Sequence, residues 1–130
     1  MADTHGNSHH QTDVAIVGAG PVGLFTVFEC GMVRLNCHVV DVLDDTGGQC
    51  TALYPEKPIY DIPGFPRVEA AELVVRLKAQ AAAFRPVYHL GEQVRSLEPL
   101  TGGFWQLTTS KGTVIQAKAV ILAAGVGAFG

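Results

Sequence analysis

Three glycines, Gly18, Gly20 and Gly23, follow a short apolar run, and Asp41 ends the next apolar run eighteen residues later. Such glycines let backbone N–H groups approach a pyrophosphate, and a helix that begins there directs its positive end at the same charge. Pro21 suits the first helical position, since proline has no N–H to leave unpaired. With an acid placed to bind a ribose hydroxyl, the pattern predicts a dinucleotide site. The alternatives are a chance glycine turn and, for Asp41, a cap on the strand end.

A second glycine pattern, Gly125, Gly127 and Gly130, follows the apolar run of residues 119–123. Two such patterns could bind two nucleotides. No acidic residue follows the second pattern to meet another ribose. We therefore expect this turn to face the same dinucleotide from the other side of the crevice, at the carboxyl ends of parallel strands.

The segment of residues 44–66 contains three glycines and four prolines, without helical or strand periodicity. It has too many apolar and aromatic groups for a disordered insertion, and loops of this length are usually functional. Gly48, with the glycine before it, lets the backbone approach a ligand. Gln49 can donate and accept at a ring edge, and Tyr54 offers an aromatic face. The alternatives are a surface turn for Gln49 and core packing for Tyr54.

The order of apolar runs and amphipathic segments predicts the elements that position these residues. Together they form an α/β fold: a Rossmann-like domain with a parallel sheet, an N-terminal βαβ unit and a small antiparallel β-meander. The apolar runs are typical of parallel strands that are covered on both faces. An amphipathic pattern predicts one further helix. The predicted strands are 12–17, 37–42, 88–90, 93–98, 103–109, 113–117 and 119–123, and the predicted helices are 21–34 and 69–84.

Composition excludes several classes of function. Charged residues make up 16% of the chain and the net charge is −3, with no basic run, so we expect no nucleic-acid partner. No apolar run reaches the length of about 18 residues that a membrane span needs. Residues 1–11 are expected to be a disordered polar tail, whose histidines lack the companions of a metal site. The three cysteines form no CxxC motif, which favours a reduced, cytoplasmic compartment.

The chain resembles the thioredoxin-reductase-like class of ferredoxin–NADP⁺ reductases. The resemblance rests on GAGPVGL, GGQCTALYPEKPIYDIPGFP and AAGVGAFG, and covers residues 12–130. It implies a two-domain flavoprotein, homodimeric at full length, in which FAD relays electrons from NADP(H) to ferredoxin or a similar iron–sulfur protein. Residues 12–130 would be the N-terminal half of the FAD-binding domain. The NADPH domain and the C-terminal FAD segment would be absent, so that the domain is incomplete.

The resemblance also assigns roles to single residues. Asp41 stands where the acid binds the adenosine ribose, and the backbone of Val94 stands where it meets the adenine. Gln49 and Tyr54 match FAD-contacting positions, with Tyr54 stacked on the isoalloxazine, and Phe129 lies beside the flavin. No catalytic side chain and no metal are expected, because the cofactor carries the chemistry. The acceptor stays open: a disulfide or quinone reductase and a non-catalytic FAD-binding module are the alternatives.

Overall fold

The computed structural model describes residues 8–124, and its main feature is a six-stranded sheet in the order β5-β2-β1-β8-β7-β6. Strands β5, β2, β1 and β8 run parallel to one another, whereas β7 and β6 continue the sheet in antiparallel pairs. This arrangement confirms the predicted Rossmann-like sheet with an attached meander. The strands are β1 (His9–Val17), β2 (Cys37–Asp41), β5 (Val87–Leu90), β6 (Val94–Pro99), β7 (Trp105–Thr109) and β8 (Val114–Leu122).

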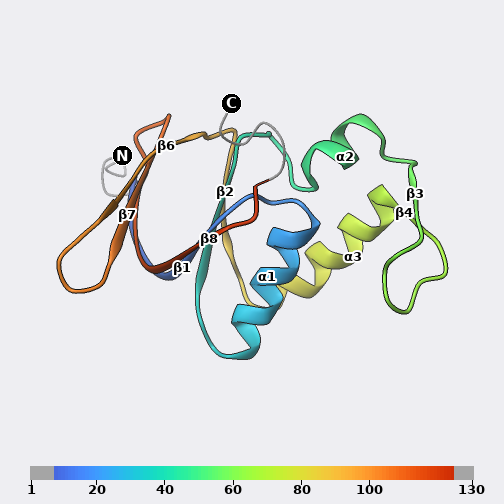
Figure 1. The fold of residues 1–130 in the computed structure, drawn as a ribbon, viewed down its shortest axis with the longest axis horizontal. Coiled ribbons are helices and arrows are strands. Elements are labelled where there is room, and N and C mark those ends of the chain that lie inside the picture. The colour runs from blue at the N-terminus through green and yellow to red at the C-terminus, as the bar shows by residue number, and fades with distance from the viewer. Residues whose placement is uncertain (1–7, 125–130) are drawn as a thin grey trace, which may run out of the picture.

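Two helices, α1 (Pro21–Met32) and α3 (Ala70–Ala82), lie side by side on one side of the parallel strands (Figure 1). Val27 and Cys30 of α1 and Ala81 of α3 pack with Ile16 and Val39 into one apolar cluster. On the opposite face, Val17 and Val40 pack with Leu107 of the meander into a second cluster. The parallel strands are therefore covered on both faces, which explains why their sequences are almost wholly apolar.

The N-terminal βαβ unit is formed by β1, α1 and β2, as predicted. Strand β1 begins at His9, earlier than the predicted residue 12, so three residues assigned to the disordered tail lie in the sheet. The physical reason is tertiary: these residues pair with the start of β8, from His9 opposite Val114 to Thr12 opposite Ala117. No helix within residues 8–124 is long and apolar enough to span a membrane.

The sequence predicted two separate strands at residues 113–117 and 119–123, and this was wrong: the structure has the single strand β8 there. It runs unbroken from the meander into the parallel sheet. Its first half pairs with β7, while its whole length pairs with β1. Lys118, the charged residue at the predicted break, lies at the exposed surface of the strand and does not interrupt it.

The segment of residues 44–66 is more ordered than its irregular sequence indicates. It contains a short helix, α2 (Gly48–Leu53), and the strand β3 (Pro58–Ile59), which pairs with β4 (Val68–Glu69). The backbone N–H of Ala71, at the start of α3, donates to the carbonyl of Pro55 at 2.9 Å. The segment is thereby fixed between the start of α1 and the start of α3.

Candidate dinucleotide site

The turn between β1 and α1 requires glycine at two of its three glycine positions. Gly18 has φ +116°, and a Cβ there would overlap the backbone carbonyl of Ala123 at the end of β8. A Cβ on Gly23 would overlap the carbonyl oxygen of Gly18. Both glycines are therefore needed for the fold itself, because they let the first turn of α1 approach the ends of two strands.

Gly20 differs from these two, because nothing in residues 8–124 forces glycine at this position. Its φ is −77°, which any residue adopts, and the nearest heavy atom to a Cβ would be the Cα of Gly48 at 3.7 Å, an ordinary contact. A glycine that the fold itself does not require is expected where a ligand approaches the backbone closely. That Cβ would face the backbone of Gly47 and Gly48, next to the start of α1.

The positive end of the helix dipole at the start of α1 has no negatively charged or capping side chain beside it. No side chain caps it, and no acidic residue lies in its first turn. Pro21 occupies the first helical position, as predicted, and the first helical hydrogen bond runs from the N–H of Leu24 to the carbonyl of Gly20 at 2.9 Å. The N–H groups of Val22 and Gly23 therefore lack an intrahelical acceptor and suit a negatively charged ligand.

The start of α2 closes the other side of this turn. Gly47 and Gly48 both have positive φ, +120° and +76°. The N–H of Gly47 donates to the carbonyl of Ala19 at 2.8 Å, and a Cβ on Gly48 would lie 3.2 Å from the Cα of Gly20. Two glycine backbones therefore face each other, and the approach of a ligand to Gly48 stays a prediction.

Asp41 lies at the end of β2 and is buried, with 9% of its surface exposed. Its Oδ2 accepts from the backbone N–H of Ala19 at 2.6 Å, and its Oδ1 accepts from the N–H of Leu43 at 2.9 Å. The carboxylate thus fastens the glycine turn to the next strand. Each carboxylate oxygen can accept more than one hydrogen bond. A cap on the turn and a ribose contact are therefore compatible, and the ribose contact stays a prediction.

The structure describes the surroundings of some of the other predicted site residues and not of others. Tyr54 follows α2 and is 64% exposed, so it does not fill the core. It lines an open hollow of about 550 Å³ with its neighbours up to Lys57. Val94 begins β6 and packs, half-buried, against the second apolar cluster. Gln49 lies in α2, whereas Phe129 and the second glycine pattern fall outside the described residues.

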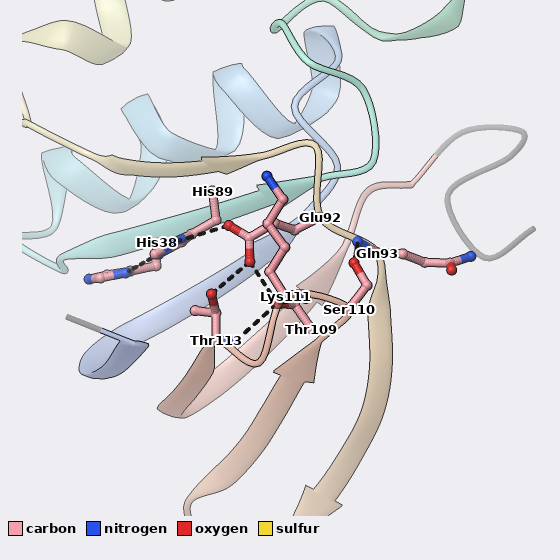
Figure 2. A network of polar contacts seen from close by, with 8 residues as sticks. All are labelled: His38, His89, Glu92, Gln93, Thr109, Ser110, Lys111 and Thr113. Atoms are coloured by element: carbon pink, nitrogen blue, oxygen red, sulfur yellow. Dashed lines mark hydrogen bonds and ion pairs between the residues drawn. The ribbon is translucent and has the colours of Figure 1, made fainter. Parts of the chain in front are cut away.

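Sequence reasoning missed a buried polar network beside Asp41. We call the side chains of His38, His89, Glu92, Thr109 and Thr113 the Glu92 network (Figure 2). Glu92 Oε1 accepts from the hydroxyls of Thr109 at 2.6 Å and Thr113 at 2.7 Å, and its Oε2 lies 3.8 Å from His89 Nδ1. The rings of His89 and His38 share a hydrogen bond of 2.9 Å. No local signal in the sequence indicates it, because its members come from four separate segments.

Burial and neighbouring charges perturb the ionisable groups of this network. Burial, together with the neighbouring His89 and His10, lowers the pKa of His38 to about 4. Burial also lowers the pKa of His89, although the charge of Glu92 opposes this. Burial acts to raise the pKa of Glu92, but the two hydroxyls and the charges of His89 and Lys111 lower it overall. The network is thus arranged for an ionised Glu92 and neutral histidines at neutral pH.

Among residues 8–124, no group of three histidine, cysteine or acidic side chains is placed to hold a metal ion.

Comparison with known proteins places this geometry in context. No protein-family model matched the chain. The ferredoxin–NADP reductase of Rhodospirillum rubrum is 60% identical over 123 residues, which cover 92% of this chain and 36% of that protein. The enzyme of the same name from Paramagnetospirillum magneticum is 61% identical, covering 95% and 36%. The chain therefore spans about a third of the length of the curated relatives it matches.

Solved structures of thioredoxin reductases share the fold. The enzyme from Streptococcus pyogenes superposes with a TM-score of 0.76 at 23% identity, covering 88% of this chain and 35% of that structure. The enzyme from T. acidophilum gives a TM-score of 0.74 at 27% identity, covering 88% and 36%. These matches confirm the resemblance on which the sequence analysis rested: the chain is similar to about a third of a ferredoxin–NADP reductase and has the fold of thioredoxin reductases.

Proposed function

We propose that this chain is the FAD-binding part of a ferredoxin–NADP reductase. The observation that carries the proposal is Gly20, which is bare at the uncapped start of α1 without a steric reason in the fold. A pyrophosphate placed there would meet the N–H groups of Val22 and Gly23 and the positive end of the helix. Bound FAD would supply hydride acceptance from NADP(H) and single-electron transfer to an iron–sulfur protein.

The other contacts with FAD are proposed from the same position of the pyrophosphate at the start of α1. Asp41 would bind the adenosine ribose while it holds the turn, and the backbone near Val94 would meet the adenine. Gln49 and Tyr54 would contact the isoalloxazine, and the exposure of Tyr54 supports this role, because a ring that packs only in the core would be covered. Phe129 would lie beside the flavin. These residues bind and orient the cofactor; none is required to act as an acid, a base or a nucleophile.

The electron acceptor is proposed from the relatives. Sequence identity of about 60% to proteins named ferredoxin–NADP reductase favours ferredoxin over the disulfide acceptor that the structural neighbours indicate at 23–27% identity. A cytoplasmic location and a homodimer at full length belong to the same proposal.

One alternative is a module that binds FAD without catalysis of its own, since the groups of the site would bind and orient a cofactor and none is placed as an acid, a base or a nucleophile.

Titration of FAD with the purified protein tests the proposal. Binding should quench the flavin fluorescence with saturation at one FAD per chain, and ADP should compete, since both ligands carry the adenosine and the pyrophosphate. Absence of both quenching and ADP binding would contradict the proposal. NADPH-dependent reduction of an iron–sulfur acceptor then separates the reductase from the non-catalytic module, which binds FAD but transfers no electrons.

A further inference from the structure

Glu92 lies in the loop between β5 and β6, directly beside the end of β2. Its backbone N–H donates to the carbonyl of Asp41 at 3.0 Å, and the N–H of Gly91 donates to the carbonyl of Leu43 at 2.8 Å. This loop leads within two residues to Val94, the first residue of β6. The loop therefore joins the proposed ribose position to the proposed adenine position.

The same loop is also held from its other side by the turn between β7 and β8. The N–H of Ser110 donates to the carbonyl of Gln93 at 2.7 Å, and the N–H of Gln93 donates to Ser110 Oγ at 3.0 Å. Figure 2 shows the Glu92 side chain reaching toward Thr113 and Thr109, which flank this turn. Glu92 thus connects three strand ends, with its backbone on β2 and its carboxylate on β7 and β8.

The Glu92 carboxylate is engaged within the protein and does not face a ligand. Glu92 is 8% exposed, and one of its oxygens accepts from two hydroxyls while the other faces His89. Thr109 Oγ1 in turn accepts from the N–H groups of Lys111 at 3.3 Å and Thr113 at 3.2 Å. Removal of the carboxylate would leave two buried hydroxyls without their acceptor, a loss that such networks transmit to the backbone they hold.

The geometry points to Glu92 as a positioning residue for the adenosine half of the cofactor. This inference rests on the proposed FAD site and adds a residue that acts through the β5–β6 loop rather than by contact. Glu92 fixes the loop between Asp41 and Val94 by accepting from Thr109 and Thr113. The flavin half of the site, at α2 and Tyr54, lies on a different segment, and the hydrogen bonds of Glu92 itself go to Asp41, Thr109 and Thr113.

The test compares Glu92→Ala with Glu92→Gln in the purified protein. Glu92→Ala should weaken the binding of FAD and of ADP by a similar factor, about tenfold, because both ligands use the adenosine half. The absorption spectrum of bound flavin at saturating FAD should stay unchanged. Glu92→Gln keeps an oxygen that can accept from both hydroxyls, so it should restore both affinities. Glu98→Ala, on the exposed part of β6, is the control with the same loss of charge.

The outcomes separate this inference from the proposed function. Failure of the unaltered protein to bind FAD or ADP would overturn both. Normal binding by the unaltered protein and by a folded Glu92→Ala variant would overturn the positioning role alone, as would a Glu92→Gln variant as weak as Glu92→Ala. If Glu92→Ala does not fold, Thr113→Val removes one hydroxyl at nearly constant volume. That variant should weaken ADP binding about threefold, and unchanged binding would overturn the inference.

Discussion

Two polar regions lie on either side of Asp41, and they are built in opposite ways. The glycine turn at the start of α1 consists of backbone, with no side-chain cap and a position, Gly20, at which the fold does not require glycine. The Glu92 network consists of side chains that bond to one another. The difference teaches that a dense cluster of polar groups need not be a ligand site. We place the proposed ligand at the unused N–H donors of the turn, whereas the satisfied network supports the structure around it.

The largest expected effect separates the glycines that the fold requires from Gly20, which we propose faces the ligand. Gly23→Ala should lower the free energy of unfolding by about 3 kcal/mol, because its Cβ would overlap the Gly18 carbonyl, a backbone atom that cannot move aside alone. Urea denaturation followed by circular dichroism measures this change. A Gly23→Ala variant as stable as the unaltered protein would show that the turn is looser than the structure indicates.

Gly20→Ala should produce the opposite pattern. The free energy of unfolding should change by less than about 1 kcal/mol, since alanine adopts the observed backbone angles without overlap. The FAD affinity should fall at least about tenfold, because the methyl group would occupy the space proposed for the pyrophosphate. Met32→Ala is the control: Met32 lies in the same helix, at its opposite end, and is 64% exposed, so the affinity should persist. Unchanged FAD binding by Gly20→Ala would remove the argument on which the proposed function rests.

The same contrast explains what sequence could predict. The glycine turn is local: its spacing, the proline at the start of α1 and the acid at the end of β2 are all read along a short stretch of chain. The Glu92 network has no such recognised spacing: the bonded partners His38 and His89 are 51 positions apart, and Thr109 and Thr113 lie on strands whose polar residues resemble any half-exposed meander. The early start of β1 at His9 likewise depends on pairing with β8, more than a hundred residues away. Local patterns could not indicate either feature.

The smallest expected effect lies in the network and depends on pH. The pKa of His38 is about 4 in the folded state, below its usual value of 6.5, so the unfolded chain binds more protons between these values. Stability from this group is therefore full above pH 6.5 and is lost as the pH falls toward 4. His38→Gln should remove this contribution, which is on the order of 1 kcal/mol after allowance for partial exposure to solvent.

The pH dependence of the urea midpoint reports His38 together with the ionisable groups that face it. His10 on β1 and His89 on β5 lie with ring centroids 5.0 and 5.1 Å from it, and Glu92 faces His89. Because His89 also has a lowered pKa, the variant should flatten the fall in urea midpoint between pH 6.5 and 4 without abolishing it. His9→Gln, on the exposed side of β1, should leave the fall unchanged. Parallel curves for His38→Gln and the unaltered protein would mean that protonation of His38 costs the fold nothing. The response of the network to acid would then come from His89.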